Sequence, residues 1–549
     1  MLRNDLSLAL CLGLLSILAI LPGISGTAVL SQGDEYMHIA TVRDSLDSGS
    51  YFLPVVNGGT NYHKPPLLFW LGMASEAIFG RSLWAVRFPA VLLGAISVML
   101  VFGTLRTLRV SRYRLVLVAL VYLFSLAVTK FGRLLMMEQA LVASMLGVVF
   151  FFARYMRYRG IQNVFLAGLV SAFAYLYKGP LFQAYSGLFL SVWALCLLWR
   201  FDLRPLRWRG RKEFGRVFRV FVVFHVPLII PVIWIGLAYS ASSHGALLMQ
   251  YFFQFENVGK FLEANQPETR IFGGWLLYSL PWTVFFLPLC FAALRSRVRT
   301  LPRFAGWVLF WAAVMFTLLH LLPNRKDTYY VLPAWPLALM GASLLVDFNT
   351  KLLRRAALAN TAITLLVTLI LLPPGIILGA GPAYYFWSLI AIAITVGVLA
   401  RWKQLPVSRR YAGMIAAGVS TMAAFQFAFL PLVDRPDAPV GMRDDLAEKL
   451  CIVSNETWDG FVFKSLLPAH DIHHAVPTLP EGCGESDRGI IVLRVENYSP
   501  PPGYTRAASW SVWKTGLGTN EIFAGLKNPD LLQTPILYYA PAQRREANR

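Results

Sequence analysis

The chain has 549 residues, of which 56% are hydrophobic and only 14% are charged, and its mean hydropathy is +0.55. Soluble domains carry about 25% charged residues, so this composition excludes an ordinary soluble enzyme and a disordered chain. The apolar residues form blocks of about 20 residues and not the alternating ten-residue segments of an outer-membrane barrel. The sequence therefore predicts an all-α polytopic membrane protein.

The net charge of +21 is unevenly distributed along the chain. Residues 1–433 carry 38 Lys and Arg against 14 Asp and Glu, whereas residues 434–549 carry 12 against 15. In a soluble protein such a basic excess would suggest nucleic acid binding. Here it belongs to the membrane part, where Lys and Arg mark cytoplasmic loops, so no nucleic acid partner is expected.

Thirteen apolar segments are predicted to cross the membrane. In chain order they are 6–29, 86–105, 113–129, 138–154, 163–177, 181–199, 217–240, 273–294, 304–322, 329–347, 357–379, 383–400 and 411–433. We interpret the first as a retained helix and not a cleaved signal peptide, because its apolar run is long. Residues 1–433 thus form a transmembrane domain, with a long first external loop at 30–85.

Basic loops alternate with loops that hold most of the acids, and the densest basic loop spans 200–219. By the positive-inside rule, the N-terminus and every basic loop are cytoplasmic. Thirteen spans then place the segment 434–549 on the opposite side of the membrane. This alternation predicts that the charged residues of the other loops face the periplasm.

The segment 434–549 is polar, with strand-like runs such as Ile490–Val495, and is predicted to be a small extracytoplasmic α/β domain. Cys451 and Cys483 are its only cysteines, and they can form one disulfide if the domain is extracytoplasmic. Its cluster of His470, Asp471, His473 and His474 can bind a metal, although an exposed polar loop is the favoured interpretation.

The first external loop begins with Asp34-Glu35, directly after the first span. If a second helix starts there, Asp34 and His38 share a face, because they are four residues apart. Adjacent carboxylates at a membrane surface suit a general base, a metal or a cationic substrate group. They suit equally well a helix N-terminus that is stabilised by acids in its first turn.

Several cations lie on the outer face, which positive-inside sorting depletes of Lys and Arg. They are Lys64, Arg133, Lys178, Arg325 and Lys326. Taken singly, each is more often a membrane anchor than a ligand. Together, and with acids such as Glu138 nearby, they indicate an anionic substrate, with phosphate as the first candidate. No P-loop, GxGxxG or HExxH pattern occurs, so nucleotide hydrolysis and zinc proteolysis are not indicated.

These motifs resemble those of the GT-C glycosyltransferases. More closely, the chain resembles the bacterial aminoarabinose transferases that modify lipid A, and their protein O-mannosyltransferase relatives. The matching stretches are Asp34-Glu35, Lys64-Pro65-Pro66, Lys178-Gly179, Tyr251–Glu256 and Lys326–Pro333. The resemblance extends over most of residues 1–433 and is weak in the C-terminal domain.

The resemblance implies a role for each matching residue. Asp34 would be the principal catalytic carboxylate beside Glu35, and Glu138 would be a second acid at the outer mouth of a later helix. The phosphate-binding residues would be Lys64, Lys178 and Lys326, and Tyr330 would line the donor cavity. Arg133 and Arg325 join the predicted phosphate-binding set because they lie among the cations of the outer face, and not through the resemblance.

Two positions near the sugar depart from the aminoarabinose pattern, so the resemblance leaves the identity of the sugar open. His63 stands where that family tends to have Glu, and Asn257 follows Glu256 where it tends to have His. No cofactor is certain from the sequence. A divalent metal is an open alternative, because Asp34, Glu35, His63 and Glu138 could build a site that their spacing does not require.

The expected protein is an integral glycosyltransferase of the bacterial inner membrane. It would transfer a sugar from a polyprenyl-phosphate donor, such as undecaprenyl phosphate, to a phosphate or sugar hydroxyl of lipid A at the periplasmic face. One alternative is transfer of a lipid-linked sugar to Ser or Thr of a protein. The other is a lipid or sugar transporter, which is disfavoured because the charges lie at one face and no internal repeat is visible.

Overall fold

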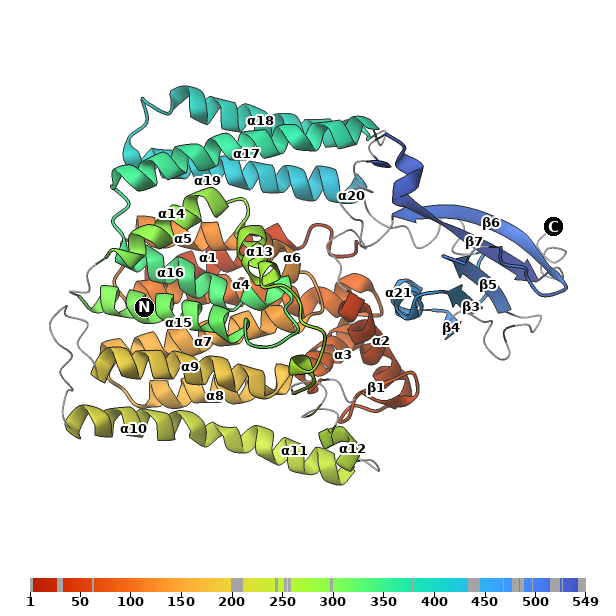
Figure 1. Ribbon diagram of the computed structural model, residues 1–549, viewed down its shortest axis with the longest axis horizontal. Helices are drawn as coiled ribbons and strands as arrows, with labels where there is room; N and C mark the ends of the chain where they lie inside the picture. Colours follow the sequence, from red (N-terminus) through yellow and green to blue (C-terminus); the bar gives the residue numbers. More distant parts are fainter. Residues whose placement is uncertain are drawn as a thin grey trace.

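The computed structural model describes residues 3–26, 33–61, 64–198, 211–241, 245–250, 254, 258–296, 300–377, 380–432, 445–467, 469–475, 483, 488–495, 497–513, 524–525 and 527–541. The chain forms a large body of long helices that lie side by side, and a smaller domain that contains a β-sheet at one end of this body (Figure 1). The predicted fold class, a helical membrane protein with a small α/β domain, is confirmed.

Each of the thirteen apolar segments contains helix. The helical body consists of α1 (Arg3–Ile20), α4 (Leu83–Thr107), α5 (Arg112–Leu123), α6 (Leu126–Phe131), α7 (Met137–Tyr158), α8 (Gln162–Lys178), α9 (Pro180–Leu198), α10 (Arg211–His225), α11 (Ile229–Ala241), α12 (Gly245–Gln250), α13 (Thr269–Tyr278), α14 (Thr283–Leu294), α15 (Leu301–Leu319), α16 (Ala334–Leu345), α17 (Lys351–Ile377), α18 (Pro382–Arg401), α19 (Val407–Ala424) and α20 (Leu430–Leu432).

Length and composition together identify fewer membrane spans than the thirteen predicted. In the described part of the chain, nine helices are long and apolar enough to cross a membrane, and α13 with α14, bent by 111°, can form a tenth span. The other three predicted spans are shorter helices: α1 is apolar over Asp5–Ile20, α5 has 12 residues before it breaks into α6, and α8 has 17. The count of thirteen therefore stays a prediction.

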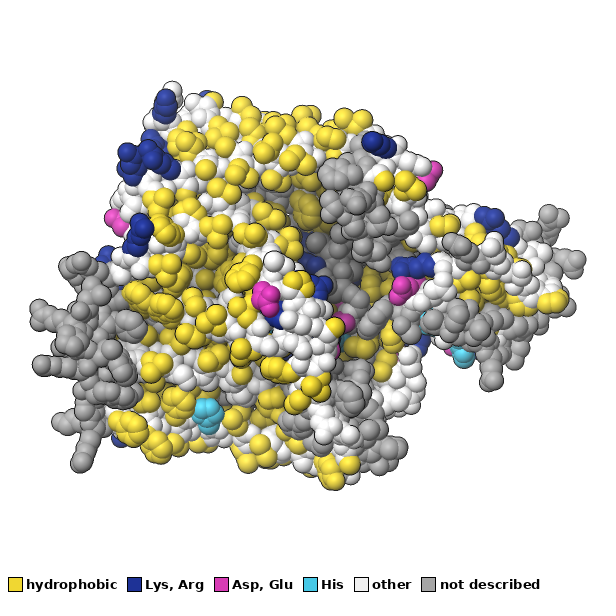
Figure 2. All heavy atoms as spheres, viewed as in Figure 1, with side chains coloured by type: hydrophobic (Ala, Val, Ile, Leu, Met, Phe, Trp, Pro, Cys, Tyr) yellow, Lys and Arg dark blue, Asp and Glu magenta, His cyan; other side chains and the backbone are white. Residues whose placement is uncertain are grey.

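The outside of the helical body is apolar along its length. Large side chains of α10, α17 and α18, such as Phe218, Ile370 and Phe386, are more than half exposed. Figure 2 shows this apolar surface, with Lys and Arg side chains gathered at the left end around the ends of α17, α18 and α19, far from the β-sheet domain. Bilayer hydrocarbon stabilises such a surface, and the basic end is the one expected at the cytoplasmic side.

Two glycines allow α15 and α16 to pack backbone against backbone. A Cβ at Gly341 would lie 2.7 Å from the Phe310 backbone N, and a Cβ at Gly306 would lie 2.9 Å from Gly341 O. Small residues at a helix crossing permit such close packing inside a membrane. Every residue of α16 is buried, so this helix lies at the centre of the body.

The first external loop folds into α2 (Gly33–Ser48), a hairpin of β1 (Val55–Val56) and β2 (Gly59–Thr60), and α3 (Leu67–Phe79). The predicted helix after the first span is thus confirmed. Side-chain hydrogen bonds join the hairpin to α2: Asn61 Nδ2 donates to Thr41 Oγ1 at 2.9 Å, and Val55 N donates to Ser45 Oγ at 2.9 Å. The loop is therefore a structured cap on the helical body.

The C-terminal domain contains one five-stranded sheet and the helix α21 (Thr457–Leu466). The strands are β3 (Lys449–Ser454), β4 (Asp471–Ala475), β5 (Arg488–Leu493), β6 (Tyr504–Trp513) and β7 (Gln533–Pro541), in the order β4-β3-β5-β7-β6. The first three strands are parallel, and β7 is antiparallel to both β5 and β6. Cys451 and Cys483 form the predicted disulfide. The predicted domain boundary at 433/434 lies outside the described residues.

A buried arginine of α2 connects this helix to the β-sheet domain. Arg43 of α2 donates from Nη1 to the carbonyl oxygens of Lys464 (3.0 Å) and Ser465 (2.8 Å), in the last turn of α21. Its Nη2 also contacts Glu76 Oε1 of α3 at 3.0 Å. The guanidinium thus satisfies carbonyl groups that a helix C-terminus leaves without partners. Val462 of α21 also packs into the core of the helical body, so α2 and α21 form one unit.

Replacing Cys451 with Ala is expected to lower the free energy of unfolding of the β-sheet domain by about 3–4 kcal/mol, because the disulfide closes a loop with a sequence separation of 32. Urea-dependent proteolysis of the purified protein under non-reducing conditions measures this change. Cys11→Ala is the matched control, since Cys11 is a free, exposed cysteine of α1. An unchanged urea midpoint for Cys451→Ala would contradict the expectation.

Candidate active site

The N-terminus of α2 presents Asp34 and Glu35 at the end of the helical body that faces the β-sheet domain. Acids in the first turn are stabilised there by the helix dipole, which explains why the helix starts at this point. The Asp34 side chain is half-buried, and it makes no hydrogen bond or ion pair with any described residue. In this respect its carboxylate differs from that of Glu35.

Glu35 has a different environment, although it is the next residue. Its carboxylate is fully buried and receives two bonds from Arg87 of α4, Nε to Oε1 and Nη2 to Oε2, both at 2.7 Å. Leu135 N also donates to Oε1 at 2.9 Å. Arg87 in turn donates from Nη1 to Ile24 O and Gly26 O, at the end of α1. This geometry favours a structural role for Glu35 over the catalytic role predicted for it.

The segment between α6 and α7 holds His38 in a single orientation. Leu135 O accepts a hydrogen bond from His38 Nδ1 at 3.0 Å, so Nδ1 carries a proton. Burial lowers the pKa of His38, the charges of Asp34 and Glu138 act against this shift, and Lys64 acts with it. The neutral ring then presents Nε2 as a hydrogen-bond acceptor, and this buried atom has no partner within the described residues.

A carboxylate and an ammonium group meet at the outer ends of α7 and α8. Lys178 Nζ lies 2.6 Å from Glu138 Oε1, and both side chains are largely buried. The ammonium also lies 5.9 Å from the Tyr329 ring centroid and 5.7 Å from that of Tyr330. Both tyrosines belong to the 3₁₀ turn η4 (Thr328–Val331). The structure therefore brings together Glu138, Lys178 and Tyr330, three residues predicted from distant parts of the sequence.

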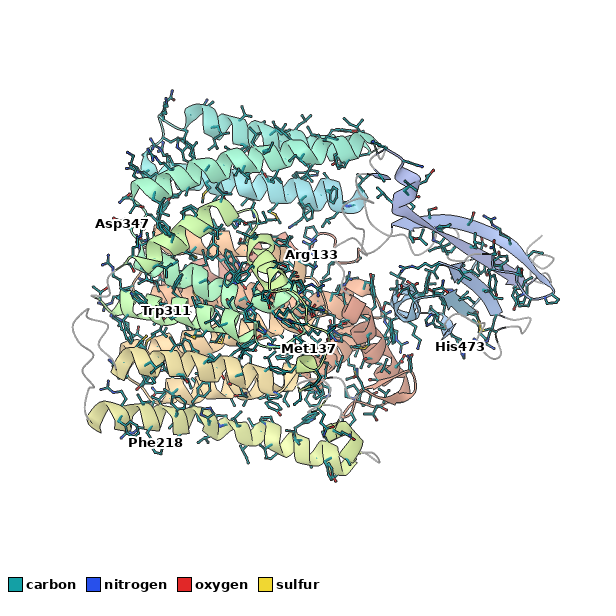
Figure 3. All side chains as sticks on the ribbon, viewed as in Figure 1. Arg133, Met137, Phe218, Trp311, Asp347 and His473 are labelled. Atoms are coloured by element: carbon teal, nitrogen blue, oxygen red, sulfur yellow. A yellow bond between two sulfur atoms is a disulfide. The ribbon has the colours of Figure 1, made fainter. Side chains whose placement is uncertain are left out.

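Arg133 is a buried cation close to the outer end of α1. Its Nη1 lies 3.4 Å from the position that a Cβ on Gly23 would take, while Nε and Nη2 have no hydrogen-bond partner in the described part of the chain. Burial and the nearby Arg87 lower the pKa of Arg133 to about 10. Figure 3 shows Arg133 and Met137 on the side of the helical body nearer the β-sheet domain, and Asp347 at the far end.

The two basic residues of the 323–328 loop are bound by neighbouring side chains. Lys326 Nζ donates to Asn265 Oδ1 at 2.6 Å, and Arg325 Nε contacts Asp327 Oδ2 at 3.1 Å. Lys326 is 2% exposed, so its ammonium group is largely enclosed by residues 265–268. A phosphate that binds Arg325 and Lys326, as predicted from the sequence, would have to compete with these bonds.

The remaining predicted residues divide into two groups. Lys64 lies half-buried just before α3, close enough for its charge to act on His38. His63, Glu256 and Asn257 lie outside the described residues. Within the described residues, no group of three or more His, Cys, Asp and Glu side chains is arranged to hold a metal ion.

Sequence reasoning missed three buried residues around this cluster. Arg87 pairs with Glu35, and His320 Nε2 lies 2.5 Å from the Tyr185 hydroxyl. The His320 ring lies 4.8 Å from the Tyr330 ring, so the histidine supports the tyrosine beside Lys178. An ionisable residue within an apolar run was the available signal for Arg87 and His320, because such residues are costly in a membrane.

Known proteins match this chain in sequence. A family model described as dolichyl-phosphate-mannose-protein mannosyltransferase matches residues 63–234. The undecaprenyl phosphate-alpha-4-amino-4-deoxy-L-arabinose arabinosyl transferase of Edwardsiella ictaluri is 27% identical over 403 residues, which are 70% of this chain and 69% of that protein. An uncharacterized protein of Aquifex aeolicus is 28% identical over 327 residues, 59% of this chain and 70% of that protein.

Solved structures match its fold. The crystal structure of ArnT from Cupriavidus metallidurans bound to undecaprenyl phosphate has a TM-score of 0.68 at 15% identity, and the match covers 98% of both chains. The apo structure of the same protein has a TM-score of 0.63 over 97% of both chains. Fold and sequence together support a multi-pass membrane glycosyltransferase that resembles the aminoarabinose transferases and shares the fold of ArnT.

Proposed function

We propose that this protein transfers a sugar from a polyprenyl-phosphate donor to a phosphate or sugar hydroxyl of lipid A, at the periplasmic face of the inner membrane. The observation that carries the proposal is the cluster of Asp34, His38, Glu138 and Lys178, at the end of the helical body that faces the β-sheet domain. The named relatives act with undecaprenyl-phosphate-linked aminoarabinose, which supports a lipid-linked donor.

Three features support a periplasmic site. Arg133 and Met137, which flank the cluster in the sequence, lie on the side of the helical body nearer the β-sheet domain (Figure 3), whereas Lys and Arg side chains gather at the opposite end (Figure 2). Lys and Arg are enriched in cytoplasmic loops. The β-sheet domain is docked to the helix that carries Asp34, so the two share one side of the membrane. Its disulfide is typical of an oxidising compartment such as the periplasm.

The proposed reaction is a displacement at the anomeric carbon of the donor sugar. The acceptor oxygen forms a bond to this carbon as the bond from the carbon to the phosphate oxygen breaks, and the polyprenyl phosphate leaves with the electron pair. Lys178 and Lys64 stabilise the negative charge that develops on the leaving phosphate. Glu138 holds the Lys178 ammonium in position through their 2.6 Å contact.

Asp34 acts on the acceptor in this scheme. If the acceptor is a hydroxyl, the Asp34 carboxylate removes its proton as the new bond forms. A phosphate acceptor is already ionised, and Asp34 then only orients it. Adding EDTA, and then Mg²⁺, to the purified enzyme tests whether a divalent metal takes part.

Lys178→Met is expected to raise KM for the lipid-linked donor by about 10-fold to 100-fold, because a hydrogen bond to a charged group contributes roughly 1.5–3 kcal/mol. The double variant Glu138→Gln/Lys178→Met avoids a buried, unpaired carboxylate and should have the same donor KM. Steady-state kinetics in detergent measure both values. Lys351→Met, at the opposite end of the body, is the control. A changed acceptor KM with an unchanged donor KM would assign Lys178 to the other substrate.

A protein acceptor is the second candidate, because the family model that matches residues 63–234 is described as a protein mannosyltransferase. Mass spectrometry of purified lipid A, from strains with and without the gene, separates the two functions. Loss of a sugar-sized mass in the deletion strain is the expected result. Identical lipid A profiles would refute the lipid A acceptor and direct the search to periplasmic glycoproteins.

A further inference from the structure

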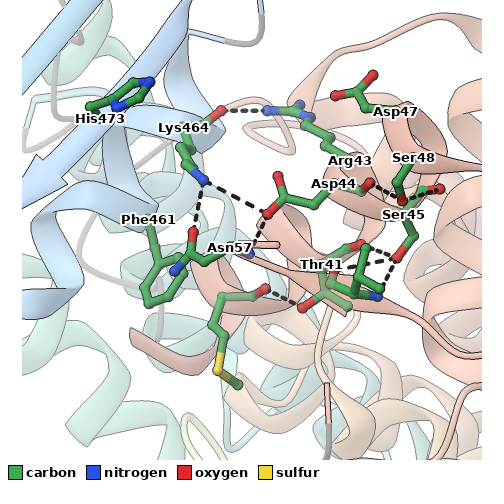
Figure 4. Close-up of polar contacts among 12 residues, drawn as sticks. Thr41, Arg43, Asp44, Ser45, Asp47, Ser48, Asn57, Phe461, Lys464 and His473 are labelled. Atoms are coloured by element: carbon green, nitrogen blue, oxygen red, sulfur yellow. Dashed lines mark hydrogen bonds and ion pairs between the residues drawn. The ribbon is translucent and has the colours of Figure 1, made fainter. Parts of the chain in front are cut away.

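A cleft of about 910 Å³ lies between α2 and the β1–β2 hairpin on one side and α21 and β4 on the other. Figure 4 shows its polar side chains, with Asp44 and Asn57 facing Lys464 and with His473 beyond them. None of these residues belongs to the Asp34 and Lys178 cluster. A volume of this size suits a ligand of several hundred daltons.

The lining of the cleft contains more hydrogen-bond acceptors than donors. Asp44 Oδ2 accepts from Asn57 N at 2.7 Å and lies 3.7 Å from Lys464 Nζ. Asp47 pairs with Arg81, and Asp471 pairs with Arg488, yet the side chains of Asp47 and Asp471 remain more than half exposed. An ionised carboxylate has about four acceptor positions, so these groups can accept further hydrogen bonds.

The lining offers an anionic ligand no excess of positive charge. Its carboxylates Asp44, Asp47 and Asp471 are balanced by the ammonium group of Lys464 and by Arg81 and Arg488, which pair with Asp47 and Asp471. Burial lowers the pKa of His474, so this histidine adds no positive charge near neutral pH. A phosphate would gain no net attraction here, whereas a ligand with many hydroxyl donors could donate to the carboxylate oxygens that remain exposed.

Phe461 adds an apolar surface to this polar lining. It projects from α21 into the cleft and is only partly buried. Carboxylate, amide and imidazole groups beside one aromatic ring offer hydrogen bonds to hydroxyl groups and a flat surface to the C–H face of a sugar ring. We propose that this cleft binds an uncharged, hydroxyl-rich saccharide portion of the acceptor, an inference that rests on the proposed function.

The cleft lies on the same helix as Asp34, so a saccharide bound in the cleft can affect the position of the acceptor in the reaction. Asp34 and Asp44 lie on the same helix, ten residues apart, which corresponds to about 15 Å along its axis. Arg43 joins the two walls through its bonds to Lys464 O and Ser465 O, so their separation is set by the fold. A saccharide held here would orient the reacting group of the acceptor toward Asp34, as remote binding groups do in other enzymes.

The test uses the full-length protein in nanodiscs and two acceptors, lipid A and lipopolysaccharide that carries further sugars. The wild type is expected to have a kcat/KM about tenfold higher for the sugar-bearing acceptor, which corresponds to one or two hydrogen bonds. Asp47→Asn/Asp471→Asn should remove this preference and leave transfer to lipid A unchanged. Both residues are at the exposed mouth of the cleft, so the fold should be retained.

Asp530→Asn is the matched control, because Asp530 is an exposed acid next to β7 and away from the cleft. Equal kcat/KM for the two acceptors in the wild type, or equal losses for both in the double variant, would overturn the inference. Absence of transfer to either acceptor would instead reject the proposed function.

Hydrogen exchange with a soluble probe tests the cleft independently of catalysis. Maltotriose is expected to slow amide exchange in 457–466 and 471–475 of the wild type, and not of the double variant. Protection by trilysine alone would identify a site for cationic peptides and overturn the inference. Protection by neither probe would also overturn it.

Discussion

Replacing Asp34 with Asn is expected to lower kcat for transfer to a hydroxyl acceptor by about 10²-fold to 10⁴-fold, the usual contribution of a general base. The variant should keep its fold. Asp34 is half-buried and makes no ion pair or hydrogen bond within the described residues, so the substitution removes no contact from that part of the structure. Transfer from a purified polyprenyl-phosphate donor, followed by mass spectrometry of the acceptor, measures the effect.

Two further measurements make the Asp34→Asn result decisive. Thermal unfolding of the variant in detergent should match that of the wild type, which separates lost chemistry from lost structure. Asp530→Asn, in the β-sheet domain, should retain full activity. If Asp34→Asn keeps more than a tenth of the wild-type kcat with a hydroxyl acceptor, another residue removes the proton. His38 is the next to test, because its Nε2 has no hydrogen-bond partner within the described residues.

Replacing Arg87 with Met is expected to destabilise the protein by about 3–5 kcal/mol, because removal of one partner leaves a buried charge unpaired. Arg87 and Glu35 are each 1% exposed or less, and Arg87 also supplies the donors for Ile24 O and Gly26 O. We expect a large drop in the purified yield and in the unfolding temperature in detergent. The double variant Glu35→Gln/Arg87→Met should recover part of this loss, since it leaves no uncompensated carboxylate.

The exposed pair of Arg81 and Asp47 provides the matched control for the buried one. Arg81→Met should change stability by less than about 1 kcal/mol, because solvent screens an exposed ion pair. An Arg87→Met protein that folds with wild-type stability but lacks activity would contradict the structural assignment. That result would indicate that Glu35 and Arg87 take part in the reaction.

The helices could be predicted because their signal is local. An apolar run of about 20 residues specifies a helix in a membrane, since every backbone polar group must be satisfied within its own segment. All thirteen such runs contain helix. The breaks within them follow from tertiary packing, as at α13 and α14, where one predicted span is bent by 111°.

The candidate site could be predicted only in part. Asp34, Glu138 and Lys178 stood out as charged residues gathered at the outer ends of apolar helices, and Tyr330 was indicated by the resemblance. Their spatial relation depends on packing between α2, α7, α8 and η4, which are far apart in the sequence. Glu35 follows Asp34 directly in the sequence, and only the structure shows that it is paired with Arg87; its predicted catalytic role stays a prediction.

The sequence by itself determined which segments are helices, which end of the body is basic, and that the polar C-terminal part is an α/β fold with two cysteines that can pair. These properties depend on composition and on neighbours in the chain. Only the tertiary structure decided which charges are available for a substrate. Arg87 binds Glu35 and Asn265 binds Lys326, whereas Asp34 has no such partner among the described residues. The physical reason is that a buried charge must be paired, and its partner is chosen by packing between distant segments.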